Sequence, residues 1–121
     1  MASDSPRRVA ENEARFRAAN EALEARATEL GYHTREELVP FLCECGDERC
    51  MEVLRLTLVE YETVRTDPVQ FLCKAGHERV AEGAGAGHLV RREDRFVVVA
   101  KEGEAAAVAA ELDPRAGEAA R

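Results

Sequence analysis

The sequence contains no tryptophan, and aromatic residues make up only 5% of its 121 residues. A chain of this length typically forms one domain, which buries about two thirds of the surface that the unfolded chain exposes. With so few aromatic side chains, its core must be mainly aliphatic and modest in size. The sequence therefore predicts a single small domain that would gain from an additional cross-link.

Lysine and long apolar runs are also scarce. Only Lys74 and Lys101 are lysines among 17 basic residues, which face 24 acidic ones, so the net charge is -7. Such a chain has no concentrated cationic face for a phosphate backbone, and we do not expect nucleic acid as its main partner. The longest apolar runs, residues 96–100 and 105–110, are too short for a membrane span or a signal peptide. We therefore expect a soluble, cytoplasmic protein with no membrane partner.

A long amino-terminal helix is the first element that the sequence predicts. Ser5 or Asp4 can cap its start, and Pro6 is tolerated in its first turn. Gly31 marks its end. The larger apolar residues of this helix recur every seven positions, at Val9, Phe16, Leu23 and Leu30. The companion heptad positions, which a two-stranded coiled coil fills with apolar residues, hold Asn12, Ala19 and Arg26. We therefore expect this stripe to pack on the chain's own domain, and we favour a monomer.

The rest of the chain alternates strand patterns with one short helix. Residues 57–60, Thr-Leu-Val-Glu, match a capping box and predict a helix over residues 58–65. The segments with strand patterns are residues 40–45, 52–56, 69–74, 89–91 and 95–101. Residues 81–87 are rich in Gly and Ala and predict a flexible loop. The expected fold class is α+β, with a long amino-terminal helix, a short capped helix and a small antiparallel sheet around a structural zinc site.

Three segments describe the expected domain organisation. Residues 1–31 form the amino-terminal helix, and residues 32–102 form a small α+β domain that binds zinc. Residues 103–121 are a tail rich in Ala and Glu, which we expect to be a frayed helix or disordered.

Three of the four cysteines lie close together in the sequence, as Cys43-x-Cys45-x4-Cys50. Thiols of a cytoplasmic protein stay reduced, and thiolates combined with an imidazole select zinc over hard cations. Side chains at positions i and i+2 of an extended segment project to the same face, so Cys43 and Cys45 can bind one ion from one side. The Gly-Asp-Glu turn that follows returns Cys50 to that ion. The spacing predicts a zinc site with three thiolate ligands.

A structural zinc site needs a fourth ligand, and the sequence offers His77 and Cys73. Cys73 lies in a strand pattern, where its side chain shares a face with Val69 and Phe71 that should belong to the core. His77 follows Gly76 in a turn and can reach the ion. We therefore favour three thiolates and one imidazole, with Cys73 as a buried bystander and as the alternative fourth ligand. The competing interpretation, that the clustered cysteines are merely small buried apolar residues, fits their polar surroundings poorly.

Further motifs accompany the cysteines. The sequence reads F-x-C-E-C at residues 41–45, E-Y-x-x-V-R at residues 60–65 and G-H-E at residues 76–78, and the amino-terminal helix carries N-E-A-R-F-R at residues 12–17. Together these motifs resemble a group of short uncharacterised actinobacterial proteins, over about residues 12–101. The resemblance implies that Cys43, Cys45, Cys50 and His77 form the ligand set, rather than a set with Cys73. It implies no established activity.

Other polar residues give weaker signals. Tyr61 and Arg65 lie one helical turn apart and would form either an anion-binding pair or a packing pair; we favour packing. We assign no role to His33 or His88. No carboxylate pair, phosphate loop or nucleophile motif predicts a catalytic reaction.

Three functions remain to be compared. We favour a zinc-stabilised, non-enzymatic module that acts through contacts with another protein. The alternative is a thiol switch, in which oxidation of Cys45 or Cys50, with Cys73 as a resolving thiol, ejects the zinc. A zinc hydrolase would need an open coordination position, and four candidate ligands argue against one.

Overall fold

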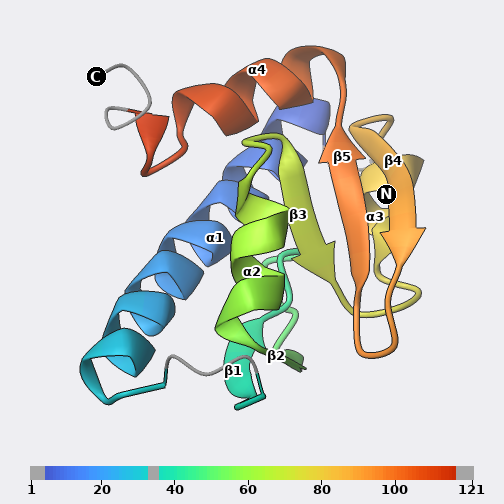
Figure 1. Cartoon of the computed structure of the whole chain (residues 1–121). Helices are drawn as coiled ribbons and strands as arrows, with labels where there is room; N and C mark the ends of the chain where they lie inside the picture. Colours follow the sequence, from blue (N-terminus) through green and yellow to red (C-terminus); the bar gives the residue numbers. More distant parts are fainter. Residues whose placement is uncertain (1–4, 33–35, 117–121) are drawn as a thin grey trace.

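The computed structural model describes residues 5–32 and 36–116 and confirms the predicted α+β class (Figure 1). Asp4 and His33 lie outside the described residues. In chain order, the helices and strands are α1 (Pro6–Glu29), β1 (Val39–Leu42), β2 (Val53–Leu56), α2 (Leu58–Arg65), β3 (Gln70–Cys73), α3 (Glu78–Gly83), β4 (Gly87–Arg92), β5 (Val97–Lys101) and α4 (Gly103–Glu111).

The strands form two antiparallel sheets rather than the single sheet that we expected. β1 pairs with β2, and a second sheet has the order β3-β5-β4. The short helix α2 lies between β2 and β3 along the chain. The sheets nevertheless meet just after β1, where the Glu44 amide donates to the Leu72 carbonyl at 2.8 Å. This link brings the predicted metal-binding segment against the end of β3.

Local signals at two helix starts act as predicted. The Ser5 hydroxyl accepts from the Arg8 amide at 3.2 Å and begins α1. At α2, Thr57 accepts from the Glu60 amide at 3.1 Å, and the Glu60 carboxylate accepts from the Thr57 amide at 2.8 Å. This reciprocal pair is a capping box, so the predicted bounds of α2 are confirmed.

Helix α1 packs on its own chain, but not through the predicted stripe. Of that stripe only Val9 is buried; Phe16 is half-buried, and Leu23 and Leu30 are 37% and 61% exposed. A strict seven-residue spacing drifts around a straight helix by about 20° per heptad, so the four side chains cannot all face one neighbour. The buried face instead consists of Val9, Ala10, Asn12, Glu13, Ala14, Arg17, Asn20 and Ala27.

The polar residues on this face are buried because each has a partner across the core. The two terminal nitrogens of Arg17 donate to the Pro68 carbonyl at 2.6 Å and the Ala109 carbonyl at 2.7 Å, and its guanidinium lies 4.4 Å from the centre of the Phe71 ring. Arg17 therefore joins α1 to α4 and to the start of β3. Buried charged groups are tolerated where they are paired in this way.

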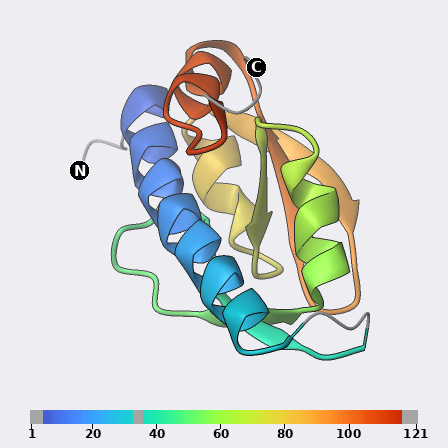
Figure 2. The same cartoon turned by 60° about the vertical axis from the view of Figure 1, so that its left-hand side comes forward.

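The carboxyl-terminal segment also departs from expectation. Residues 103–111 form helix α4, which crosses the amino-terminal half of α1 and buries Ala105, Val108 and Ala109 (Figures 1 and 2). Of the two expected alternatives, this stretch is the helical one, and it packs against α1 instead of being disordered, because alanine-rich helices can approach each other closely. Residues 117–121 lie outside the described part of the chain. All three expected segments contribute side chains to one hydrophobic core.

Two further boundaries differ. The expected flexible loop at residues 81–87 is partly helical, since α3 extends to Gly83 and β4 begins at Gly87. The expected strand over residues 40–45 ends at Leu42, so Cys43 and Cys45 lie beyond β1. Phe41 of β1 stacks on Tyr61 of α2, with the ring centres 4.4 Å apart. This contact anchors β1 just before the cysteines.

Candidate metal centre

The segment that carries the cysteines leaves β1 and turns sharply before it returns as β2. The Cys43 amide donates to the Glu52 carbonyl at 3.1 Å, and the Cys50 amide donates to the Asp47 carbonyl at 2.9 Å. Gly46 has φ +88°, a backbone conformation that favours glycine. A Cβ at this position would lie 2.7 Å from Val9 Cγ1, so glycine is also needed for space. We call residues 43–50 the cysteine loop.

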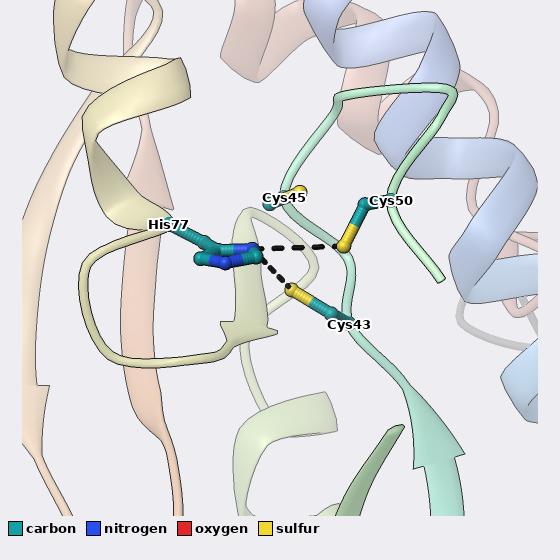
Figure 3. A group of neighbouring side chains, drawn as sticks. All are labelled: Cys43, Cys45, Cys50 and His77. Carbon is teal, nitrogen blue, oxygen red and sulfur yellow. Dashed lines mark hydrogen bonds between the residues drawn. The ribbon is translucent and has the colours of Figure 1, made fainter. Parts of the chain in front are cut away.

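His77 reaches the cysteine loop from another part of the fold. The chain turns after β3, where the His77 amide donates to the Lys74 carbonyl at 2.9 Å and Gly76 has φ +96°. The Gly76 amide donates to the Glu78 carboxylate at 2.6 Å and so orders the start of α3. Figure 3 shows the imidazole pointing from this turn toward the sulfurs of Cys43 and Cys50. The ring is therefore placed by the tertiary contact between β3 and the cysteine loop.

Cys43, Cys45, Cys50 and His77 form one cluster. One donor atom from each lies within 4.8 Å of the other three, and His77 Nδ1 is 3.6 Å from both Cys43 Sγ and Cys50 Sγ. Zinc binds sulfur at about 2.3 Å and nitrogen at about 2.0 Å, so tetrahedral ligands of these types lie about 3.5 Å apart. The two sulfur–nitrogen distances thus match the edges of a tetrahedral zinc site.

The thiols lie close together and are largely buried, which affects their ionisation. The Lys74 amide donates to Cys43 Sγ at 3.3 Å. The pKa of Cys45 is raised by its hydrogen bond with Cys43 and then by burial, and burial raises the pKa of Cys50. Three thiols in such close contact ionise together only when a cation offsets their charge, which a divalent metal would do.

Cys73 lies beside this cluster but is not a member of it. Its side chain is 1% exposed at the end of β3, and the amide of the next residue, Lys74, donates to Cys43 Sγ. The four mutually close donor residues include His77 and not Cys73, which is the arrangement that the sequence favoured. Cys73 remains a buried neighbour of Cys43.

Residues of α1 hold the cysteine loop in place, and sequence reasoning did not identify them. The Asn20 amide group donates to the Leu42 carbonyl at 2.9 Å and to the Glu44 carboxylate at 2.8 Å, and its oxygen accepts from the Leu42 amide at 2.8 Å. Asn12 donates to the Gly46 carbonyl at 2.9 Å. Asn12 and Asn20 lie eight positions apart, about two helical turns, so their shared face was visible in the sequence although their partners were not.

Glu44, between two of the cysteines, is completely buried. Burial raises the pKa of this carboxyl to about 7, although the hydrogen bonds from Asn20 and from the Leu72 amide oppose the shift. The Leu72 amide donates to Glu44 at 3.1 Å. Glu44 therefore joins α1, the cysteine loop and β3 through its hydrogen bonds with Asn20 and the Leu72 amide.

Tyr61 and Arg65 form a packing and ion-pair network. The Tyr61 hydroxyl donates to Glu21 at 2.6 Å, and the Arg65 guanidinium pairs with Glu21 at 3.3 Å and with Asp113 at 2.5 Å. Arg115 completes the network through Glu21 at 2.5 Å. With two carboxylates on Arg65, the pair is not arranged for an added anion, in agreement with the packing interpretation. The network also fastens the end of α4 to α1 and α2.

Comparisons with known proteins give no family for this chain. No protein-family model matches it, and neither a curated protein nor a solved structure matches it. Among the described residues, no helix is long and apolar enough to cross a membrane.

Proposed function

We propose that the chain is a zinc-binding protein in which Cys43, Cys45, Cys50 and His77 hold one structural zinc ion. The observation that supports this proposal is the convergence of the four donor atoms within 4.8 Å of one another, with sulfur–nitrogen distances of 3.6 Å. Three of these donors lie in the cysteine loop, and the fourth, His77, is separated from that loop along the chain by β2, α2 and β3. Side chains that reach one point from such distant segments are a stronger indication of a shared ion than a local run of cysteines.

Zinc is the metal that best suits these donors. Soft thiolates select zinc, copper(I) or iron–sulfur clusters, whereas hard cations prefer oxygen ligands. Three thiolates and one imidazole are a common structural zinc set, and four protein ligands fill a tetrahedral ion. This set therefore favours a structural role over a hydrolytic one, in which zinc keeps a position open for water or substrate.

We propose that the protein is non-enzymatic and acts in the cytoplasm through contacts with another protein. Its charge supports a protein partner over nucleic acid. The net charge is -7, and several of its arginines pair with carboxylates within the fold, among them Arg65, Arg91, Arg95 and Arg115. A gel-shift assay with mixed-sequence duplex DNA should show no binding that weakens with salt, since few basic side chains remain for the phosphates.

We further propose that the chain belongs with the short actinobacterial proteins that its motifs resemble. The residues that carry the resemblance are also residues that meet in the fold: the F-x-C-E-C and G-H-E motifs supply the metal donors, and E-Y-x-x-V-R supplies Tyr61 and Arg65. A purified member of that group, chosen for these motifs, should also bind zinc.

The deciding experiment measures metal content and stability together. Purified protein should contain about one zinc per chain, and Cys43→Ser, Cys45→Ser, Cys50→Ser or His77→Ala should lower both the zinc content and Tm. Cys73→Ala is the matched control, because it removes a buried thiol from the same region and should leave the zinc content unchanged. Cobalt substitution should give the strong visible bands of tetrahedral coordination. Unchanged stability in excess chelator would contradict the proposal, and a loss of zinc in Cys73→Ala with none in His77→Ala would indicate an all-cysteine site.

A further inference from the structure

Cys73 lies beside a proposed zinc ligand without belonging to the ligand set. It is 1% exposed, and the next residue, Lys74, donates its amide to Cys43 Sγ. Hydrogen bonds on both sides hold the two residues together: the Glu44 amide donates to Leu72 at 2.8 Å, and the Lys74 amide donates to Cys43 Sγ at 3.3 Å. A spare thiol is thus held against a metal-binding sulfur.

The thiols form a continuous path from the surface to the interior. Cys50 is half-buried, whereas Cys43, Cys45 and Cys73 are each 1% exposed. The sulfurs of Cys50, Cys45 and Cys43 lie within 4.8 Å of one another, and the backbone contacts at Leu72 and Lys74 place Cys73 beside Cys43. An oxidant that reaches only Cys50 can therefore oxidise the buried thiols indirectly, through successive thiol–disulfide exchange between neighbouring cysteines.

We propose that Cys73 is the resolving thiol of the zinc site, and that a hydroperoxide replaces the zinc by a Cys43–Cys73 disulfide. This inference rests on the proposed function, since it requires zinc at the four-donor cluster. It adds a regulation of that site: the protein would report oxidant by releasing its metal while keeping its fold.

The reaction balances with one hydroperoxide for each disulfide. The Cys50 thiolate attacks hydrogen peroxide, so an S–O bond forms, the O–O bond breaks and hydroxide leaves. The Cys43 thiolate then attacks the Cys50 sulfur, forms a disulfide and releases a second hydroxide, and the zinc has lost two ligands. Finally the Cys73 sulfur attacks the Cys43 sulfur, and its proton passes to the departing Cys50 thiolate. Two thiol sulfurs have lost two electrons in total, and the peroxide has gained them.

The disulfide would replace the cross-link that the zinc provides. Zinc joins the cysteine loop to His77, in the turn just after β3, and a Cys43–Cys73 bond would join the same loop to the end of β3 itself. Removing zinc with a chelator from the reduced protein offers no such replacement. We therefore expect oxidised, metal-free protein to stay folded under conditions in which reduced, metal-free protein unfolds. The last exchange step should take minutes to hours, because uncatalysed disulfide rearrangement is slow and the Cys73 thiol is buried.

The test uses the zinc-loaded full chain, its Cys73→Ser variant and hydrogen peroxide. Zinc content is measured first, released zinc is then followed with a chelating dye, and folding is followed by far-ultraviolet circular dichroism. Disulfides are mapped without reduction after cleavage with trypsin and a Glu-specific protease. Cleavage after Glu44 separates Cys43 from Cys45, while cleavage after Arg49 and Lys74 isolates the peptides that carry Cys50 and Cys73.

The expected result is one zinc released per wild-type chain, a Cys43–Cys73 disulfide and a retained helical spectrum, with recovery after reductant and zinc are added. The Cys73→Ser variant should start with the same zinc content, form only disulfides among Cys43, Cys45 and Cys50, and lose its helical spectrum as zinc leaves. A wild-type map in which Cys73 stays a free thiol would overturn this inference and leave the zinc site standing. A chain without zinc at the start would overturn the proposed function and this inference with it. If Cys73→Ser does not fold, the wild-type map still decides.

Discussion

Glu13 of α1 and Lys101 of β5 form an ion pair in the interior of the protein, 2.5 Å apart, with both side chains fully buried. The Lys101 ammonium also lies 5.6 Å from the centre of the Phe71 ring. Taking both charges out of water has a large cost, which the pair offsets only while both partners are present. The pair joins the first helix to the last strand, and thereby closes the core around β3.

The first prediction concerns this pair. At about pH 8, above the raised pKa of Glu13, Glu13→Ala or Lys101→Ala alone should each lower the free energy of unfolding by about 3–5 kcal/mol, because each leaves one buried charge without a partner. The double variant Glu13→Leu with Lys101→Met should lose much less than the sum of the single variants. Urea unfolding of zinc-saturated protein measures all three, and single variants within about 0.5 kcal/mol of wild type would show that the pair contributes nothing.

The second prediction is a pH dependence that Glu13 imposes. Burial, its largest cause, raises the pKa of Glu13 from 4.5 to about 7, although the Lys101 charge opposes the shift. Between these two values the native carboxyl holds a proton that the unfolded chain has released. The contribution of Glu13 to the free energy of unfolding is therefore full below pH 4.5 and is lost as the pH rises through about 7.

Glu13→Gln is the matched variant, since it keeps the shape and removes the titration. The unfolding free energy of wild type minus that of Glu13→Gln should fall by up to about 3 kcal/mol across this pH range. Both proteins carry the same cysteines and histidine, so metal-linked pH effects cancel in the difference when zinc is saturating. A difference that rises with pH would contradict the assignment of the raised pKa to Glu13.

The third prediction compares two glycines. Gly46→Ala should lower the free energy of unfolding by about 1–3 kcal/mol and weaken zinc binding, because its φ of +88° disfavours a side chain and its Cβ would meet Val9. Gly83→Ala is the control: no atom lies within 4 Å of its added Cβ, its φ is not positive and it ends α3, so a small gain in stability is expected. Equal effects at both positions would show that the turn at Gly46 does not shape the metal site.

The fourth prediction concerns the face through which α1 packs. Val9→Ala should lower Tm, with a loss of about 1–3 kcal/mol, whereas Leu23→Ala should have little effect because Leu23 is 37% exposed. Neither Tm should depend on protein concentration if α1 packs only within its own chain. Analytical ultracentrifugation should show a monomer. A Tm that rises with concentration, together with a large effect of Leu23→Ala, would instead indicate a self-associating helix.

Sequence reasoning succeeded where the determining interactions are local. Ser5 begins α1, and Thr57 with Glu60 sets the start of α2, because a capping side chain bonds to amides only three residues away. The cysteine spacing is local in the same sense, since two thiols two residues apart and a glycine turn suffice to bring three sulfurs together. The turn at Gly76 likewise indicated that His77 was free to join them.

Only the tertiary structure decided which side of α1 is buried and what holds the cysteine loop. Apolar spacing indicated Phe16, Leu23 and Leu30, but the buried face carries Glu13, Arg17 and Asn20. A polar side chain is buried at low cost only where it has a hydrogen-bonding or charged partner. Glu13 pairs with Lys101, Arg17 donates to the Ala109 carbonyl, and Asn20 donates to the Leu42 carbonyl.

The same reason explains Glu44 and α4. A glutamate between two cysteines appears in the sequence as a solvated charge, and it becomes a buried link only because Asn20 and the Leu72 amide meet it there. The alanine-rich segment that forms α4 has few large apolar side chains to drive its own packing. It is ordered by its contact with α1, and Ala105 and Ala109 are fully buried. The sequence by itself determined the helix starts and the clustering of Cys43, Cys45 and Cys50 through short-range chemistry, and it offered His77 as a candidate to join them. The polar interior that positions those donors depends on pairs of residues 22 to 92 positions apart, whose meeting only the folded chain determines.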